Sequence, residues 1–384
     1  MKSKKFNTKV IHAGHGADES TGSVMPPINL SSTFQQKNPG EFKYEYARTK
    51  NPTRDVLEKL IAEVEGGERA FAFASGMAAI NTLCEIFGTN CHVICSDDVY
   101  GGTRRLFDKV KAKSQNLEVS YVDFDTNINW NDLVKKNTKF IWVETPSNPL
   151  LKIIDIRNVV EIAKGFKIPV ICDNTFASAY NQRPLELGAD IVMNSSTKYL
   201  GGHSDLIGGS IALNKNSAIA EEIQYLQNAI GSVPSPFDCY LLVRSIKTLS
   251  VRMEKHNSNA MQIASFLQNH PKISKVYYPG LENSKNHDIA KKQMHGFGGM
   301  MSIVLNTDMD GVKKFLKHLS IFTLAESLGG VESLIEHPAI MTHASIDKDI
   351  RDSLGISDTL LRLSIGIEDT SDIQTDLEEA LEQI

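Results

Sequence analysis

Long hydrophobic runs are missing from this chain of 384 residues. No stretch approaches the roughly 20 consecutive apolar residues that a membrane-spanning helix needs, so a membrane protein is not expected. Charge of one sign is not in excess either, because 41 Lys and Arg residues stand against 46 Asp and Glu residues. This mild balance gives no reason to expect nucleic-acid binding. Internal repeats are also missing, and the length allows one large core and a smaller one.

Cysteine is scarce, with five residues in the whole chain. They lie in apolar runs and form no close Cys-x-x-Cys pair, which predicts buried, reduced thiols in a cytoplasmic protein rather than a disulfide framework. The five are Cys84, Cys91, Cys95, Cys172 and Cys239.

From about Ala70 onward, short apolar runs alternate with amphipathic stretches. This alternation predicts an α/β fold with a mostly parallel central sheet and helices on both faces. The predicted strands are 70–73, 92–95, 119–122, 140–143, 170–172, 191–193 and 210–213. After Pro236, a long helical pattern over about 238–268 leads to further strands at 273–277, 300–305 and 361–365, which we expect to form a smaller α/β C-terminal domain. The segment 25–52 has little periodicity and is too long for a simple loop, which favours an arm that packs on another subunit.

Lys198 follows the predicted strand 191–193, and Asp173 follows the strand 170–172. A lysine that can form a Schiff base and a carboxylate that can hold a ring nitrogen are what pyridoxal 5'-phosphate (PLP) needs from a protein. Ligands of α/β sheets bind at the carboxyl ends of the strands, where both residues fall. A lone lysine in such a polar segment is more often simply exposed, and a strand-end aspartate can cap the next turn, so the assignment depends on the combination.

Other residues fit the same cofactor. Small residues over 74–79 end a strand and open a helix, where free N–H groups and the helix dipole attract a phosphate, although many α/β proteins use small residues there for packing alone. Ser195 and Thr197 flank the lysine and offer hydroxyl donors. Tyr100 lies at another strand end, where its ring either stacks on the pyridine or packs as a loop aromatic.

Arg362 is a charge inside the apolar run 360–366, and such a residue is usually paired or functional. The planar guanidinium of Arg grips a carboxylate through two parallel hydrogen bonds, which suits an amino-acid substrate. A nicotinamide dehydrogenase is disfavoured because no Gly-x-Gly-x-x-Gly follows the early strands. A non-catalytic binding or scaffold protein is the alternative from another class, and the intact set of Lys198, Asp173, Tyr100 and Arg362 argues against it.

These blocks together resemble the PLP-dependent Cys/Met metabolism family of fold type I, the transsulfuration enzymes. The resemblance covers nearly the whole chain, and its blocks are 26–28, 46–54, 74–78, 144–149, 173–176, 195–199 and 324–330. It implies the PLP-dependent transferase fold of type I. The implied organisation is an N-terminal arm over 1–60 that contacts the neighbouring subunit, a PLP-binding domain over 61–250 and a C-terminal domain over 251–384.

The resemblance also implies a role for each residue of the site. Lys198 would carry the cofactor and shuttle protons, Asp173 would pair with the ring nitrogen, and Tyr100 would stack on the ring and assist deprotonation. His203 is then expected to make structural hydrogen bonds rather than to act as a base. The other implied cofactor contacts are Gly76, Met77, Thr175, Ser195 and Thr197, with Tyr46 and Arg48 from the neighbouring subunit, and the implied substrate contacts are Asn148, Glu326, Ser327 and Arg362. No metal is needed, and a homo-oligomer built from dimers, a homotetramer, is implied.

Within the family, the blocks 233–240 and 336–345 look most like cystathionine γ-lyases. Glu326 resembles the glutamate of the γ-acting enzymes, whereas β-lyases tend to carry a tyrosine there. The expected reaction is therefore γ-elimination of L-cystathionine to cysteine, 2-oxobutyrate and ammonia. Cystathionine γ-synthases share almost every other block, so γ-replacement of O-succinyl- or O-acetylhomoserine with cysteine is the alternative. Methionine γ-lyases typically carry cysteine at the position of Gly102, so that activity is not expected. Close relatives often carry asparagine at the position of Gly201, so Gly201 is a departure on the substrate side.

Overall fold

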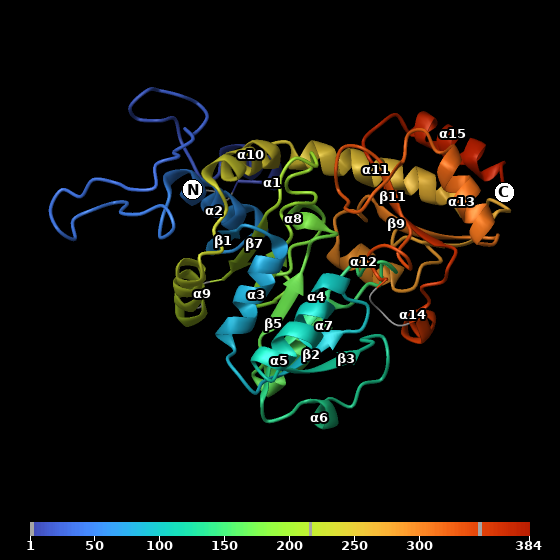
Figure 1. The fold of residues 1–384 in the computed structure, drawn as a ribbon, viewed down its shortest axis with the longest axis horizontal. Coiled ribbons are helices and arrows are strands. Elements are labelled where there is room, and N and C mark those ends of the chain that lie inside the picture. The colour runs from blue at the N-terminus through green and yellow to red at the C-terminus, as the bar shows by residue number, and fades with distance from the viewer. Residues whose placement is uncertain (1–3, 215–216, 345–347) are drawn as a thin grey trace.

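The structure is a computed structural model that describes residues 4–214, 217–344 and 348–384. Its strands form a seven-stranded sheet in the order β1-β7-β6-β5-β4-β2-β3 and a five-stranded sheet in the order β10-β11-β12-β9-β8 (Figure 1). In the described part of the chain, no helix is long and apolar enough to cross a membrane. Ser345, the last residue of the block 336–345, lies outside the described residues.

The larger sheet confirms the predicted strands to within two residues. Strands β3, β2, β4, β5 and β6 pair in parallel, and β7 runs antiparallel to both β6 and β1, so the sheet is mostly parallel as expected. The strands are β1 (Arg69–Phe73), β2 (His92–Ser96), β3 (Glu118–Val122), β4 (Thr138–Glu144), β5 (Val170–Asp173), β6 (Ile191–Asn194) and β7 (Gly209–Leu213).

The smaller sheet contains the three strands predicted for the C-terminal part and two that were not predicted. Its strands are β8 (Ile273–Tyr277), β9 (Met300–Leu305), β10 (Thr323–Leu324), β11 (Leu334–Glu336) and β12 (Leu360–Ser364). β10 and β11 have two and three residues, which is too short for an apolar alternation to show in the sequence.

The single helix predicted over 238–268 is wrong. The structure has two helices there, α10 (Pro236–Ile246) and α11 (Leu249–Leu267). The carbonyl of Ser245 accepts hydrogen bonds from the Thr248 hydroxyl at 3.0 Å and from Arg252 Nη2 at 3.0 Å. These side chains compete with the helical backbone bonds at this point, so one helix ends and a second begins.

The remaining helices cover the sheets or lie in connections (Figure 1). They are α1 (Phe6–His12), α2 (Pro52–Glu65), α3 (Gly76–Ile86), α4 (Gly101–Arg105), the π-helix η1 (Leu106–Lys111), α5 (Ala112–Ser114), α6 (Trp130–Leu133), α7 (Ile156–Phe166), α8 (Ser178–Asn181), α9 (Ser217–Ile230), α12 (His287–Gln293), α13 (Met309–His318), α14 (Lys348–Leu354) and α15 (Thr370–Leu381).

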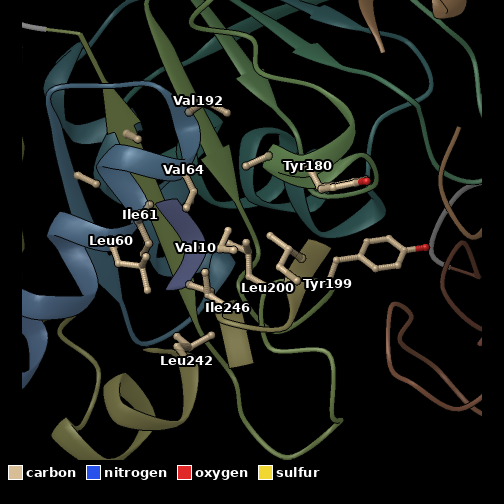
Figure 2. Packing of buried hydrophobic residues seen from close by; sticks show 14 of the residues in the cluster. Val10, Leu60, Ile61, Val64, Tyr180, Val192, Tyr199, Leu200, Leu242 and Ile246 are labelled. Atoms are coloured by element: carbon tan, nitrogen blue, oxygen red, sulfur yellow. The ribbon is translucent and has the colours of Figure 1, made fainter. Parts of the chain in front are cut away.

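The N-terminal segment has a packed part and an extended part. Val10 of α1 and Leu60 of α2 are buried in one cluster with Leu242 of α10 and with Leu200, close to the predicted cofactor lysine (Figure 2). Between α1 and α2 the chain runs away from the body of the molecule (Figure 1) and exposes apolar side chains, Val24 among them. Exposed apolar residues on an irregular segment suit contact with another subunit. The domain boundaries given above stay predictions.

Candidate active site

Lys198 lies in the turn that follows β6, and the residues after it are anchored in the core. Tyr199 and Leu200 belong to the buried cluster of Figure 2, and the Tyr199 hydroxyl accepts the Gly299 N–H at 3.1 Å. The Lys198 amine donates to Ser327 Oγ at 2.7 Å. Burial, and then the charge of Arg362, lower the pKa of the Lys198 amine to about 8. The amine can therefore exchange a proton near neutral pH.

Asp173 ends β5 and is 6% exposed. Its Oδ1 accepts the Thr175 N–H at 3.0 Å and the Thr175 hydroxyl at 2.6 Å. Thr175 Oγ1 in turn accepts the Ser195 N–H at 2.9 Å, so Thr175 links the aspartate to the lysine loop. Burial raises the pKa of the Asp173 carboxyl to about 6, against the opposing effect of the Thr175 hydrogen bonds. A buried carboxylate held in this way favours a cation such as a protonated ring nitrogen.

The start of α3 and the lysine loop form a cradle that suits a phosphate. Ser75 caps α3 by accepting the Ala78 N–H at 3.0 Å. A Cβ on Gly76 would lie 3.0 Å from Ser195 Cβ, so only glycine lets the helix N-terminus approach this loop so closely. Thr197 donates its hydroxyl to the Gly208 carbonyl at 3.2 Å, and Met77, beside Gly76, is half-buried. Free N–H groups at a helix start bind phosphate well, so these residues fit PLP.

Arg362 is held by several groups at once. Its Nη1 donates to Asn148 Oδ1 at 2.9 Å, and its Nη2 donates to the Ser327 carbonyl at 2.8 Å. Nη2 also lies 2.9 Å from Glu336 Oε2, in an ion pair whose side chains are 3% and 1% exposed. Glu336 on β11 stands opposite Arg362 on β12 in the register of the sheet. Thr342 donates its hydroxyl to Glu336 Oε1 at 2.8 Å, which fixes the carboxylate.

Ser327 bridges Lys198 and Arg362 from a strained backbone. Its φ is 103°, a conformation that residues with a Cβ rarely adopt. The loop lies tightly on the lysine turn, because a Cβ on Gly329 would be 2.8 Å from the Tyr199 nitrogen. Strain of this kind is concentrated at functional sites, and here it brings the Ser327 hydroxyl to one predicted residue and its carbonyl to the other.

Tyr100 precedes α4, and its side chain is partly exposed. Its backbone N–H donates to Glu144 Oε2 at 2.9 Å. Burial raises the pKa of the Tyr100 hydroxyl, and the charges of Glu326 and Arg362 act on it as well. A Cβ on Gly102 would overlap the Tyr100 ring, so glycine at position 102 permits the position of this ring.

Within one chain, no hydrogen bond or ion pair of the described residues joins Tyr46 or Arg48 of the N-terminal arm to Lys198. Arg48 Nη1 donates to the Asn228 carbonyl at 2.6 Å and to Asn228 Oδ1 at 3.1 Å. The Arg48 guanidinium lies 5.6 Å from the centre of the Tyr46 ring. Their role in a neighbouring subunit stays a prediction. Glu326 is exposed, and its charge acts on the pKa of Lys198, which places it at the open side of the site.

Two buried carboxyl groups, Glu144 and Glu336, received no role from the sequence. Glu144 follows the apolar run 140–143, and Glu336 follows another short apolar run, so a charge directly after a buried strand was the available signal.

His203 Nδ1 lies 2.7 Å from the Gly201 carbonyl, the structural hydrogen bond that was expected. All five cysteines are free and buried, as expected. Within the described ranges, no three or more His, Cys, Asp or Glu side chains lie close enough together to bind a metal ion.

Comparison with known proteins gives consistent matches over the full chain. A family model described as Cys/Met metabolism PLP-dependent enzyme matches residues 7–382. A protein of Coxiella burnetii named cystathionine beta-lyase is 53% identical over 381 residues, which cover 99% of this chain and 98% of that protein. The crystal structure of cystathionine gamma-lyase from Lactobacillus plantarum, complexed with L-serine, has a TM-score of 0.96 and 47% identity and covers 99% of both chains. The crystal structure of cystathionine gamma synthase from Xanthomonas oryzae pv. oryzae has a TM-score of 0.96 and 41% identity, over 99% of this chain and 98% of that one.

Proposed function

Since the chain belongs to the Cys/Met metabolism PLP-dependent enzyme family, we propose that it catalyses the γ-elimination of L-cystathionine to cysteine, 2-oxobutyrate and ammonia. The family membership establishes the PLP-dependent chemistry of sulfur-containing amino acids. The choice of reaction within the family depends on the residues around the substrate.

The geometry of the strand ends supports the cofactor-binding roles. When bound, PLP supplies an electron sink for negative charge that develops at the substrate α-carbon. Asp173 would hold the ring nitrogen, and Lys198 would carry the cofactor. Tyr100 would cover one face of the ring, and the start of α3 with Ser195 would hold the phosphate.

Arg362 would bind the α-carboxylate of the substrate, together with Asn148. The Arg362 Nε is buried and has no hydrogen-bond partner among the described residues, so one donor of the guanidinium fork is available to a carboxylate. The contacts of Nη1 and Nη2 with Asn148, Ser327 and Glu336 hold the fork in place before substrate arrives.

Lys198 would move the protons. Once its amine is free, Lys198 Nζ would accept the α-proton, pass it on to the bound cofactor, and only then accept a proton from the β-carbon. The thiolate would then leave the γ-carbon and take up a proton to form cysteine. A pKa of about 8 lets the amine accept and release protons at neutral pH. Ser327 Oγ, at 2.7 Å from Nζ, keeps the amine at one position between these transfers.

Glu326 is the observation that carries the choice of γ-elimination. Its exposed carboxylate lies at the open side of the site, where it can pair with the distal ammonium group of cystathionine. The Coxiella burnetii relative is named a cystathionine beta-lyase, and one similar structure is a cystathionine gamma synthase. The competing candidates are therefore β-elimination of cystathionine and the γ-replacement that forms cystathionine.

One assay separates the three reactions. The purified protein is incubated with L-cystathionine, and 2-oxobutyrate from γ-cleavage is measured against pyruvate from β-cleavage. A parallel incubation with O-succinyl- or O-acetylhomoserine plus cysteine measures the formation of cystathionine. We expect the highest kcat/KM for 2-oxobutyrate formation, with Lys198→Ala as the inactive control. A preference for pyruvate or for cystathionine formation would overturn the choice of reaction and leave the family and cofactor standing.

The exposed arm and the buried cysteines support two further proposals. The protein would work as a homotetramer built from dimers, and it would be cytoplasmic. Light scattering on the purified protein tests the first proposal, because a monomer would contradict a site shared between subunits.

A further inference from the structure

Glu144 joins two loops of the site that are separate in the sequence. It ends β4 with its side chain buried, and it stands next to Asp173 in the register of β4 and β5. Its Oε2 accepts the backbone N–H of Tyr100 at 2.9 Å. The backbone N–H of Asn148 acts on the pKa of the same carboxyl group and lowers it. One buried carboxyl therefore bonds the loop before α4 and faces the loop after β4.

We propose that Glu144 is a positioning residue, which sets the backbone of Tyr100 over the cofactor ring and the backbone of Asn148 beside Arg362. This inference rests on the roles of Tyr100 and Asn148 in the proposed function. The side chain of Tyr100 does not cap the short helix α4 that it precedes, so the bond to Glu144 is what fixes the entry to this helix. Loss of that bond would let both loops shift, and a displacement of about 1 Å in such a site can cost roughly a hundredfold in rate.

The neighbouring carboxyl groups explain why Glu144 can do this without disturbing the ring nitrogen. Burial, and then the charge of Asp173, raise the pKa of Glu144 well above its ordinary range. Asp173 accepts two hydrogen bonds from Thr175, which favour its charged form. Two adjacent buried carboxyl groups do not both ionise readily, so the negative charge stays on Asp173. Glu144 then accepts the Tyr100 N–H as a neutral acid.

The Asp98 carboxyl holds the other side of the loop after β4. It is buried, and it accepts the Ser147 hydroxyl and the Leu150 N–H, the latter at 3.3 Å. Its charge also acts on Glu144, in the same direction as that of Asp173. Asn148 therefore lies in a segment whose neighbours are already fixed, and it faces the Glu144 carboxyl.

The test compares Glu144→Asp with Glu144→Gln. Aspartate keeps the carboxyl but withdraws it from both N–H groups, whereas glutamine keeps the shape and a neutral oxygen. The matched control is Asp376→Glu on α15, because the buried Asp376 carboxylate also accepts backbone N–H groups, those of Ser320 at 2.7 Å and Ile321 at 3.0 Å, and no residue of the candidate site lies on this helix. The measurements are the Kd of the apoprotein for PLP, the kcat and KM for L-cystathionine, and the melting temperature.

We expect Glu144→Asp to raise the Kd for PLP and to lower kcat/KM by about tenfold or more each, and Glu144→Gln to stay within about threefold of wild type. Asp376→Glu should lower the melting temperature alone. The inference is overturned if Glu144→Asp keeps both values within about twofold, or if Glu144→Gln loses as much as Glu144→Asp. If Glu144→Asp does not fold, a tenfold loss in Glu144→Gln overturns it alone. The Kd for PLP is measured without substrate. It therefore still tests the role of Glu144 if the protein acts on a substrate other than L-cystathionine.

Discussion

Replacing Glu65 with glutamine should stabilise the protein, and the gain should grow with pH. Glu65 ends α2 and is 0% exposed. Its Oε1 accepts a hydrogen bond from Asn194 Nδ2 at 2.8 Å. Glu65 Oε2 and Asn194 Oδ1 are both buried and have no hydrogen-bond partner within the described ranges. Two unpaired buried acceptors destabilise the folded protein unless one of them carries a proton. Burial raises the pKa of Glu65 to about 8, so the folded protein holds it as a neutral acid.

The sign of the pH dependence follows from this raised pKa. Below the ordinary pKa of 4.5, Glu65 is protonated in both the folded and the unfolded chain, and its full contribution to stability is present. Above 4.5 the unfolded chain ionises while the folded chain does not, so stability is lost as pH rises towards about 8. At about 1.36 kcal/mol per pH unit, the loss is roughly 3 kcal/mol at pH 7 and roughly 4–5 kcal/mol above pH 8.

Glutamine stays neutral at every pH and keeps an oxygen for Asn194 Nδ2, while its own NH₂ group can donate to Asn194 Oδ1. Thermal unfolding of wild type and Glu65→Gln between pH 5 and pH 9 checks the prediction. The difference in Tm should be small at pH 5 and reach several degrees at pH 8. The control is Glu63→Gln, two residues earlier on the exposed face of the same helix, whose Tm difference should not change with pH. A Glu65→Gln difference that is constant with pH, or that becomes negative at pH 8, would refute the buried neutral acid.

Lys198→Ala should lose turnover and the visible absorbance of covalently held cofactor while keeping a cooperative melt; a yellow, active variant would contradict the assignment. Mixing inactive Arg48→Ala with inactive Lys198→Ala under conditions that exchange subunits should restore about a quarter of wild-type activity, because half of randomly paired dimers are hybrids and each has one intact site. No recovery despite proven exchange would count against a shared site. Glu326→Ala should raise the KM for cystathionine about fivefold, a modest effect because the carboxylate is exposed, with a smaller change for a substrate that lacks the distal amine. Equal changes for both substrates would argue against that contact.

Much of the fold and the cofactor site followed from local sequence patterns. A buried parallel strand is a short apolar run, and its carboxyl end is the place where a ligand binds, so the sequence alone places Lys198 and Asp173 at one edge of a sheet. The strands of the larger sheet agree with this prediction to within two residues. Gly102 served in the sequence only to argue against a methionine γ-lyase, and the structure adds that a Cβ at this position would overlap the Tyr100 ring where it lies here.

Other features depend on contacts between residues far apart in the sequence. The break between α10 and α11 comes from side chains that take the Ser245 carbonyl, and an apolar pattern shows which residues face the core but not which carbonyl is taken. The two-residue strand β10 leaves no pattern, because too few residues alternate.

The sequence by itself therefore determined the α/β architecture and the cofactor, and it predicted the residues of the site, because each is encoded in a short run of neighbouring residues. Only the tertiary structure decided the protonation and the pairing of the buried charged groups. Glu65 is neutral because α2 buries it against Asn194, and Arg362 is held by Glu336 because β11 and β12 pair in that register. Charge in a protein interior depends on burial and on the nearest partners in space, and neither is a property of the local sequence.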